Sequence, residues 1–125
     1  MKRISCLILA LSVLATLAGC AAGPEQKLTQ REITAWPENE FTAQVFPPEA
    51  GMPSYTVTDG DGSFFCVCYE GITREEGEEY LERLYEAGYT VTERADEDNV
   101  LLERAGTNLS VSCGEGALVI YISFS

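Results

Sequence analysis

The stretch "TNLSVSCGEGALVIYISF", residues 107–124, decides the fold because it contains two alternating segments separated by a tight turn. Such alternation is typical of strands that bury one face. Gly114 and Gly116 lie between the segments and mark a hairpin turn. The stretch therefore predicts two antiparallel strands of a sheet. The residues on their buried face are Thr107, Leu109, Val111 and Cys113, then Leu118, Ile120, Ile122 and Phe124.

The clearest helix signal precedes this hairpin, at residues 73–88. Thr73 and Glu76 have the spacing of a capping box, in which each side chain accepts a hydrogen bond from the other residue's backbone N–H. Gly88 lies where a left-handed residue ends many helices. Gly77 falls on the apolar face, although glycine disfavours a helix by ~1 kcal/mol, and we expect it to let the helix approach a sheet closely. The apolar stripe consists of Tyr80, Leu84 and Ala87.

Four more segments have the composition or alternation of strands: residues 54–58, 64–69, 89–94 and 99–104. The element order becomes β-β-α-β-β-β-β. This order predicts the α+β class, an antiparallel sheet with one main helix packed on a face. We also expect a short N-terminal helix after Pro37, because proline suits the first helical position. Phe41 and Val45 would dock that helix on the sheet.

The turn between the first two of these strands reads "DGDG", residues 59–62, which is a strong hairpin signal. A calcium loop is the alternative interpretation. Oxygen-bearing side chains fall at positions 1, 3, 5 and 12 of an EF-hand-like loop: Asp59, Asp61, Ser63 and Glu70. Such a loop requires glycine at position 6, where this chain has Phe64. The sequence therefore favours a hairpin turn over a metal site.

The first twenty residues have the organisation of an export signal. A basic start precedes an apolar run from residue 4 to residue 18, which is shorter than the ~20 residues that a membrane-spanning helix needs. The run ends in Leu17-Ala18-Gly19-Cys20, which resembles the lipobox of bacterial lipoprotein precursors. That resemblance implies cleavage before Cys20 and a diacylglyceryl group on its thiol, and two acyl chains suffice for stable anchoring. We expect residues 1–19 to be this signal peptide; an uncleaved anchor is the alternative.

The remaining chain is expected to consist of a lipidated tether, residues 20–35, and a single domain, residues 36–125. The tether segment is polar and lacks periodicity. The Trp36-Pro37 opening, the acidic segment behind it and the Pro47-Pro48 stop resemble the start of a family of small lipoproteins of clostridia-like Gram-positive bacteria. That family is a domain of unknown function. The resemblance runs from Trp36 to the C-terminus and implies no catalytic residue.

The chain is strongly acidic and contains no histidine. Loss of residues 1–19 removes two of the eight basic residues and none of the twenty acidic ones, so the remaining 106 residues carry a net charge of −14. Such a surface repels nucleic acid and anionic headgroups and favours a cationic partner. Without histidine, Ser-His-Asp and Cys-His activation of a nucleophile and the commonest zinc sites are excluded.

Three cysteines lie in the expected domain: Cys66, Cys68 and Cys113. Cys66 and Cys68 are two residues apart in a strand, so they point to the same face, ~6.5–7 Å apart. Cys113 is expected on the core face of its strand. We expect all three to be buried free thiols. A disulfide from Cys113 to Cys66 or Cys68 is one alternative if the strands are neighbours, and a soft-metal site is another.

Glutamates occupy the rest of the helix and are expected to face water (Glu75, Glu76, Glu78, Glu79, Glu82 and Glu86). Two carboxylates in a concave site could act as acid and base, so a carboxylate-dependent hydrolase of cell-wall glycans is the alternative function. We predict instead a non-enzymatic binding or positioning domain without a cofactor. It would lie on the extracytoplasmic face of the cell membrane, held to the bilayer through Cys20, and bind an extracellular protein or cationic partner.

Overall fold

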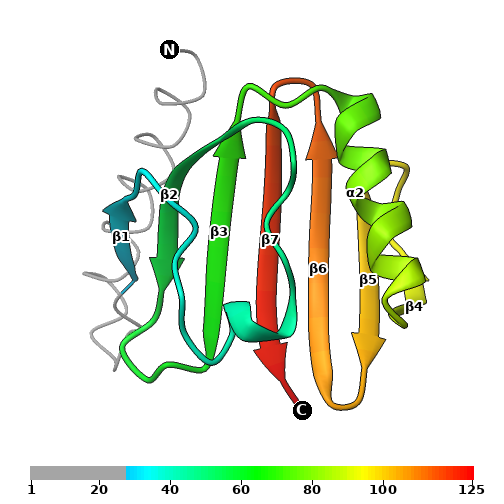
Figure 1. The fold of residues 1–125 in the computed structure, drawn as a ribbon. Coiled ribbons are helices and arrows are strands. Elements are labelled where there is room, and N and C mark those ends of the chain that lie inside the picture. The colour runs from blue at the N-terminus through cyan, green and yellow to red at the C-terminus, as the bar shows by residue number, and fades with distance from the viewer. Residues whose placement is uncertain (1–27) are drawn as a thin grey trace, which may run out of the picture.

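The computed structural model describes residues 28–125, and the predictions for the signal peptide, the lipobox and Cys20 lie outside this range. The described residues form a seven-stranded sheet in the order β1-β2-β3-β7-β6-β5-β4, with all neighbouring strands antiparallel (Figure 1). The strands are β1 (Thr29–Glu32), β2 (Met52–Thr58), β3 (Phe64–Glu70), β4 (Thr90–Arg94), β5 (Asn99–Arg104), β6 (Thr107–Gly114) and β7 (Ala117–Phe124). The helical elements are η1 (Thr42–Gln44) and α2 (Arg74–Glu86).

The predicted α+β class with a short N-terminal helix is wrong. Strands take up 46% of the described residues and helices 16%, so the fold is a large antiparallel sheet with one α-helix within residues 28–125. The six predicted strand segments all form strands, and in β5, β6 and β7 the alternation of the sequence matches one buried face. The class was wrong because the sheet has a further strand and the expected N-terminal helix is absent.

A single 3₁₀ turn, η1, stands where the N-terminal helix was expected. The side-chain oxygen of Asn39 accepts hydrogen bonds from the backbone N–H groups of Phe41 and Thr42, at 2.8 and 2.9 Å. The turn therefore begins at Asn39, as an Asx-type turn, and not at Pro37, where the helix was expected to begin. Val45 is already extended, with φ −134° and ψ −179°, and Phe46 after it is disfavoured in a helix because it precedes Pro47.

The strand β1 lies inside the segment that was interpreted as a tether. Its four residues pair with β2, with Arg31 opposite Thr56. All four are exposed, so the segment shows none of the apolar alternation that indicates a strand. The folded sheet therefore begins at Thr29, seven residues before the predicted domain boundary at Trp36.

The helix α2 has the predicted ends and the predicted orientation. Thr73 accepts a hydrogen bond from the N–H of Glu76, and Glu76 accepts one from the N–H of Thr73, which completes the capping box. Tyr80 and Leu84 are buried against the sheet. Gly88 follows the helix with φ +104°, a conformation that glycine adopts without strain.

One face of the sheet is covered by two segments that lie side by side in Figure 1. The helix α2 covers the β5 and β6 side, and the loop from residue 33 to residue 51 covers β3 and β7. Two buried tyrosines hold the loop in place: the Tyr80 hydroxyl donates to the Phe46 carbonyl at 2.7 Å, and that of Tyr89 donates to the Gln44 carbonyl at 2.8 Å. The core lies between this layer and the sheet.

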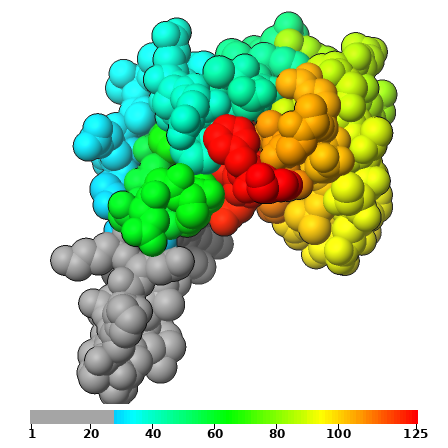
Figure 2. Space-filling view, turned by 90° about the horizontal axis from the view of Figure 1, so that it is seen from below, coloured from blue at the N-terminus to red at the C-terminus, as the bar shows by residue number. Residues whose placement is uncertain are grey.

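The C-terminal end of β7 closes the lower end of this core. In Figure 2 its red residues lie between the teal loop and the orange β5–β6 turn. The ring of Phe124 stacks on that of Phe41 with centroids 4.8 Å apart, and the N–H of Ser125 donates to the Gly106 carbonyl at 2.8 Å. These contacts tie the last strand to both neighbouring segments.

The hairpin turn between β2 and β3 satisfies its own polar groups. Asp59 is buried, and its carboxylate accepts hydrogen bonds from the N–H of Ser63, at 2.9 Å, and from the Ser63 hydroxyl. The hydroxyl bond is the largest cause that lowers the pKa of Asp59. Gly62 has φ +69°, as such a turn requires. Asp59 would be the first ligand of the alternative calcium loop, but both of its carboxylate oxygens accept hydrogen bonds within the turn.

Candidate functional site

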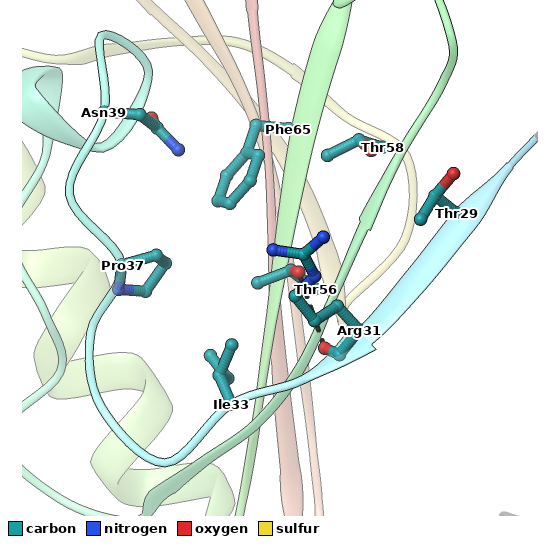
Figure 3. Close-up of a pocket in the computed structure, with 8 residues that line it drawn as sticks. All are labelled: Thr29, Arg31, Ile33, Pro37, Asn39, Thr56, Thr58 and Phe65. Atoms are coloured by element: carbon teal, nitrogen blue, oxygen red, sulfur yellow. Dashed lines mark hydrogen bonds between the residues drawn. The ribbon is translucent and has the colours of Figure 1, made fainter.

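A groove of about 350 Å³ opens at the β1 edge of the covered face (Figure 3). Its volume lies at the lower end of the range for small-molecule sites. Four elements form it: the edge strand β1, its neighbour β2, the loop that follows β1, and the start of β3. The lining residues are Thr29, Arg31, Ile33, Pro37, Asn39, Thr56, Thr58 and Phe65.

Arg31 projects into this groove because of its register on β1. It lies opposite Thr56, and Thr29 lies opposite Thr58, so these four side chains share the covered face of the sheet. The hydroxyl of Thr56 donates a long hydrogen bond, 3.5 Å, to the Arg31 carbonyl. Figure 3 shows the guanidinium group turned toward the open centre of the groove.

Asn39 faces Arg31 from the other side of the groove. Its side-chain oxygen is held by the N–H groups of Phe41 and Thr42, so the orientation of the amide is decided by this network. The amide nitrogen therefore points into the groove, as Figure 3 shows. Two donors, one of them charged, thus converge on the same space.

The remaining walls of the groove are apolar. Ile33 and Pro37 come from the loop, and the half-buried ring of Phe65 forms the wall on β3. Phe65 stacks on Phe41 with centroids 6.1 Å apart and an interplanar angle of 14°. Phe41 is itself fixed by its stack on Phe124 and by the hydrogen bond of its N–H to Asn39, so the position of the Phe65 ring is well supported.

Arg31 differs from the arginines that support the fold. Arg74 pairs with Asp98, and Arg104 donates to the carbonyls of Ala87 and Gln44 at 2.8 and 3.1 Å. Arg83 lies 3.5 Å from a Glu49 oxygen and stacks over Phe46. Within residues 28–125, no carboxylate lies at ion-pair distance from Arg31, and the same holds for Arg94 on the opposite edge strand.

A second groove, of about 340 Å³, lies between α2 and the end of the loop. It is lined by Glu49, Ala50, Glu76, Glu79, Tyr80, Glu82 and Arg83. Three of the α2 glutamates thus border a concave surface, and two of these, Glu79 and Glu82, face water as the sequence predicts. Glu79 and Glu82 are exposed, and Glu76 is engaged in the capping box. A catalytic carboxylic acid is held in a buried, apolar environment, and the two exposed carboxylates have no such environment.

The three cysteines are buried and free, and they lie on opposite faces of the sheet. Cys113 faces α2, in the core. Cys66 and Cys68 belong to the other face, since Val67 between them is in the core. Their strand β3 is separated from β6 by β7. The strands are not neighbours and the side chains point to opposite faces of the sheet. Cys113 therefore cannot form a disulfide with Cys66 or Cys68.

The thiols of Cys66 and Cys68 interact with each other and with Tyr55. The interaction between the two thiols is the largest cause that raises the pKa of Cys66, and it lowers the pKa of Cys68. An interaction with the Tyr55 hydroxyl also lowers the pKa of Cys68, while burial is the largest cause that raises the pKa of Tyr55. Burial raises the pKa of the Cys113 thiol to about 11. Among the described side chains, no three of the types His, Cys, Asp and Glu are grouped to hold a metal ion.

Sequence patterns single out neither Arg31 nor Asn39. The one available signal is weak: a strand would place Thr29, Arg31 and Ile33 on one face, but only Ile33 of the three is apolar. Nothing in the sequence shows that the chain turns back after Pro37 and brings Asn39 opposite Arg31. The cysteines and carboxylates are recognisable in the sequence by residue type, whereas this groove depends on the path of the loop.

The chain matches no model of a protein family, no curated protein and no solved structure. The resemblance to lipoprotein precursors and to the clostridia-like family therefore stays a prediction from the residues that carry it. Within residues 28–125, no helix has both the length and the apolar character needed to cross a bilayer.

Proposed function

We propose that this protein is a cell-surface lipoprotein, tethered through Cys20, whose domain binds a ligand or partner in the groove between Arg31 and Asn39. One observation carries the binding role. In a chain with a net charge of −12, the Arg31 guanidinium is turned into a concave space and has no carboxylate partner in the described part of the chain. An arginine in such surroundings is available to a ligand, since most of its binding capacity is unused.

The tether and the groove lie close together in the sequence. Thr29, which lines the groove, follows the expected lipid attachment site at Cys20 by nine residues. Nine residues span at most ~30 Å even when fully extended. The groove would therefore be held within about one domain diameter of the membrane surface, where a ligand released at or bound to the envelope is encountered first.

The alternative function, a carboxylate-dependent hydrolase of cell-wall glycans, has one observation in its favour. Three helix glutamates and Glu49 border the second groove. A glycosidase needs one carboxylic acid whose pKa is raised by burial. The exposure of Glu79 and Glu82 and the capping role of Glu76 favour the binding function over the hydrolase.

The proposal is tested by affinity isolation from detergent-solubilised membranes. The wild-type protein and the Arg31→Gln variant would serve as baits, with Arg94→Gln as the matched control because Arg94 is an exposed arginine on the opposite edge strand. Material retained by wild type and by Arg94→Gln, and lost with Arg31→Gln, is the expected result. Equal recovery by all three proteins would contradict a binding role for this groove.

A further inference from the structure

The chemistry of the groove also indicates which kind of ligand it takes. We propose that the groove binds the carboxylate of a small ligand, with Arg31 and Asn39 holding the carboxylate and Phe65 contacting the ligand's apolar part. This inference rests on the proposed binding function of the same groove. The net negative charge favours cationic partners for the surface as a whole. In this groove, by contrast, the proposed ligand is an anion.

The polar end of the groove presents donors without a competing acidic side chain on the same face. The guanidinium of Arg31 offers two parallel N–H groups, which match the two oxygens of a carboxylate. The Asn39 amide nitrogen adds a neutral donor whose direction is set by the hydrogen bonds to Phe41 and Thr42. Glu32 follows Arg31 on β1 but opposes Tyr55, which places it on the other face of the sheet.

A carboxylate fits this charge pattern better than a phosphate. The groove offers one cation, whereas phosphate carries close to two negative charges near neutral pH. Exposed Glu38 and Glu40 flank Asn39 in the chain and would repel a second negative charge more than a single one. A single carboxylate matches the single guanidinium, and its remaining contacts can be apolar.

The opposite end of the groove suits an apolar body. Phe65, Ile33 and Pro37 form this end, and Phe65 is supported from behind by its stack on Phe41. The volume of about 350 Å³ admits one small ring or branched chain rather than a long segment. The expected ligand is therefore a small organic acid, or a terminal residue that carries a free carboxylate.

The inference is tested with two probes that differ only in charge and hydrogen-bonding pattern: N-acetylphenylalanine and its C-terminal amide. Binding to the full-length protein in detergent micelles can be followed by the fluorescence of Trp36, the only tryptophan, which adjoins Pro37 in the groove wall. For a ligand of this size, a dissociation constant on the order of 1 mM is expected. The amide should bind about tenfold more weakly, because it places a donor against Arg31.

Three variants separate the polar contacts. Arg31→Gln should weaken binding of the acid about tenfold, and Arg31→Lys by a smaller factor, because a lysine retains the charge but not the fork of donors. Asn39→Asp should also weaken it about tenfold, while it retains the oxygen that accepts from Phe41 and Thr42 and so preserves the turn. Arg94→Gln should change it less than twofold.

The outcomes separate this inference from the binding function on which it rests. If the acid and the amide bind equally and both are weakened by Arg31→Gln, the groove binds ligands but the carboxylate assignment is wrong. Tighter binding of inorganic phosphate than of the acid would overturn it in the same way. If the acid shows no binding, or binding that Arg31→Gln leaves unchanged, the inference fails, and the affinity isolation decides separately whether the groove binds a partner.

Discussion

A Cβ atom added to Gly77 of α2 would lie 3.1 Å from the Sγ of Cys113 on β6 and 3.2 Å from its Cβ. The helix thus approaches the sheet at a point where the chain has a glycine on one side and a small thiol on the other. This contact explains why the helix has a glycine on its apolar stripe despite the cost in helix propensity. Tyr80 and Leu84, one and two turns further along the same stripe, are buried in the core.

Substitution of Gly77 by alanine is expected to destabilise the fold. Alanine would raise the helix propensity by ~1 kcal/mol, but its methyl group would press on the Cβ of Cys113, which cannot turn away. Overpacking of this kind costs ~1–3 kcal/mol, so a net loss of about 1 kcal/mol is predicted. Urea unfolding measures it. The control is Gly60→Ala, where the added methyl group meets nothing within 4 Å; a gain in stability for Gly77→Ala would refute the close contact.

Truncation of Leu84 tests how α2 faces the sheet. Its side chain is fully buried, so Leu84→Ala should lower the free energy of unfolding by ~2–5 kcal/mol. The matched control is Val91→Ala on β4, which is 42% exposed and should change stability by less than about 0.5 kcal/mol. Similar small effects for both substitutions would mean that the helix packs through another face.

The stability of the fold should fall at high pH, partly because of Cys113. Burial raises the pKa of this thiol from 9.0 to about 11. The unfolded thiol therefore loses its proton first, so this contribution to stability is complete below about pH 9 and is lost as the pH rises toward about 11. Glu78 and Asp98 add to the raised pKa, while Arg74 opposes it.

Urea unfolding of wild type and Cys113→Ala at about pH 8 and about pH 11 measures this contribution. The variant should lose less stability between the two values than wild type does. The fall that remains in the variant belongs to other groups, among them Tyr80, whose pKa burial also raises. Equal losses in the two proteins would show that the Cys113 thiol does not contribute.

Membrane attachment should depend on Cys20. Cys20→Ala removes the thiol that the predicted lipobox presents for lipidation, so lipid labelling should be lost and the unprocessed chain should accumulate. Metabolic labelling with a radioactive fatty acid, followed by membrane fractionation, is the measurement. Cys113→Ala serves as a control that also removes one cysteine. Normal processing and membrane retention of the Cys20→Ala protein would exclude the lipoprotein assignment.

The sequence predicted those elements whose signals are local. The capping box at Thr73 and the alternation in residues 107–124 depend only on neighbours in the chain, and both elements lie where they were expected. The strand β1 was missed because it lies at the sheet edge with both faces exposed, where polar residues are as acceptable as apolar ones. Its pairing partner β2 is more than twenty residues away.

The candidate site could not be predicted for a related reason. Arg31 reaches the covered face only because β1 pairs in one register with β2, and a shift by one residue would turn its side chain to the other face. Asn39 reaches the groove because its side chain, rather than the backbone after Pro37, starts the turn at η1. The sheet order also determines that Cys113 cannot form a disulfide with Cys66 or Cys68, since β7 separates β3 from β6.

The binding role of the groove is tested most directly by the amide NMR resonances of the protein in detergent micelles during titration with N-acetylphenylalanine. Binding in the groove should produce saturable shifts at Arg31, Asn39 and Thr58, with little change along α2 at Glu79 and Glu82. The shifts should disappear in the Arg31→Gln protein and persist in the Arg94→Gln protein. Shifts centred on α2, or shifts at the groove that Arg31→Gln leaves in place, would contradict it.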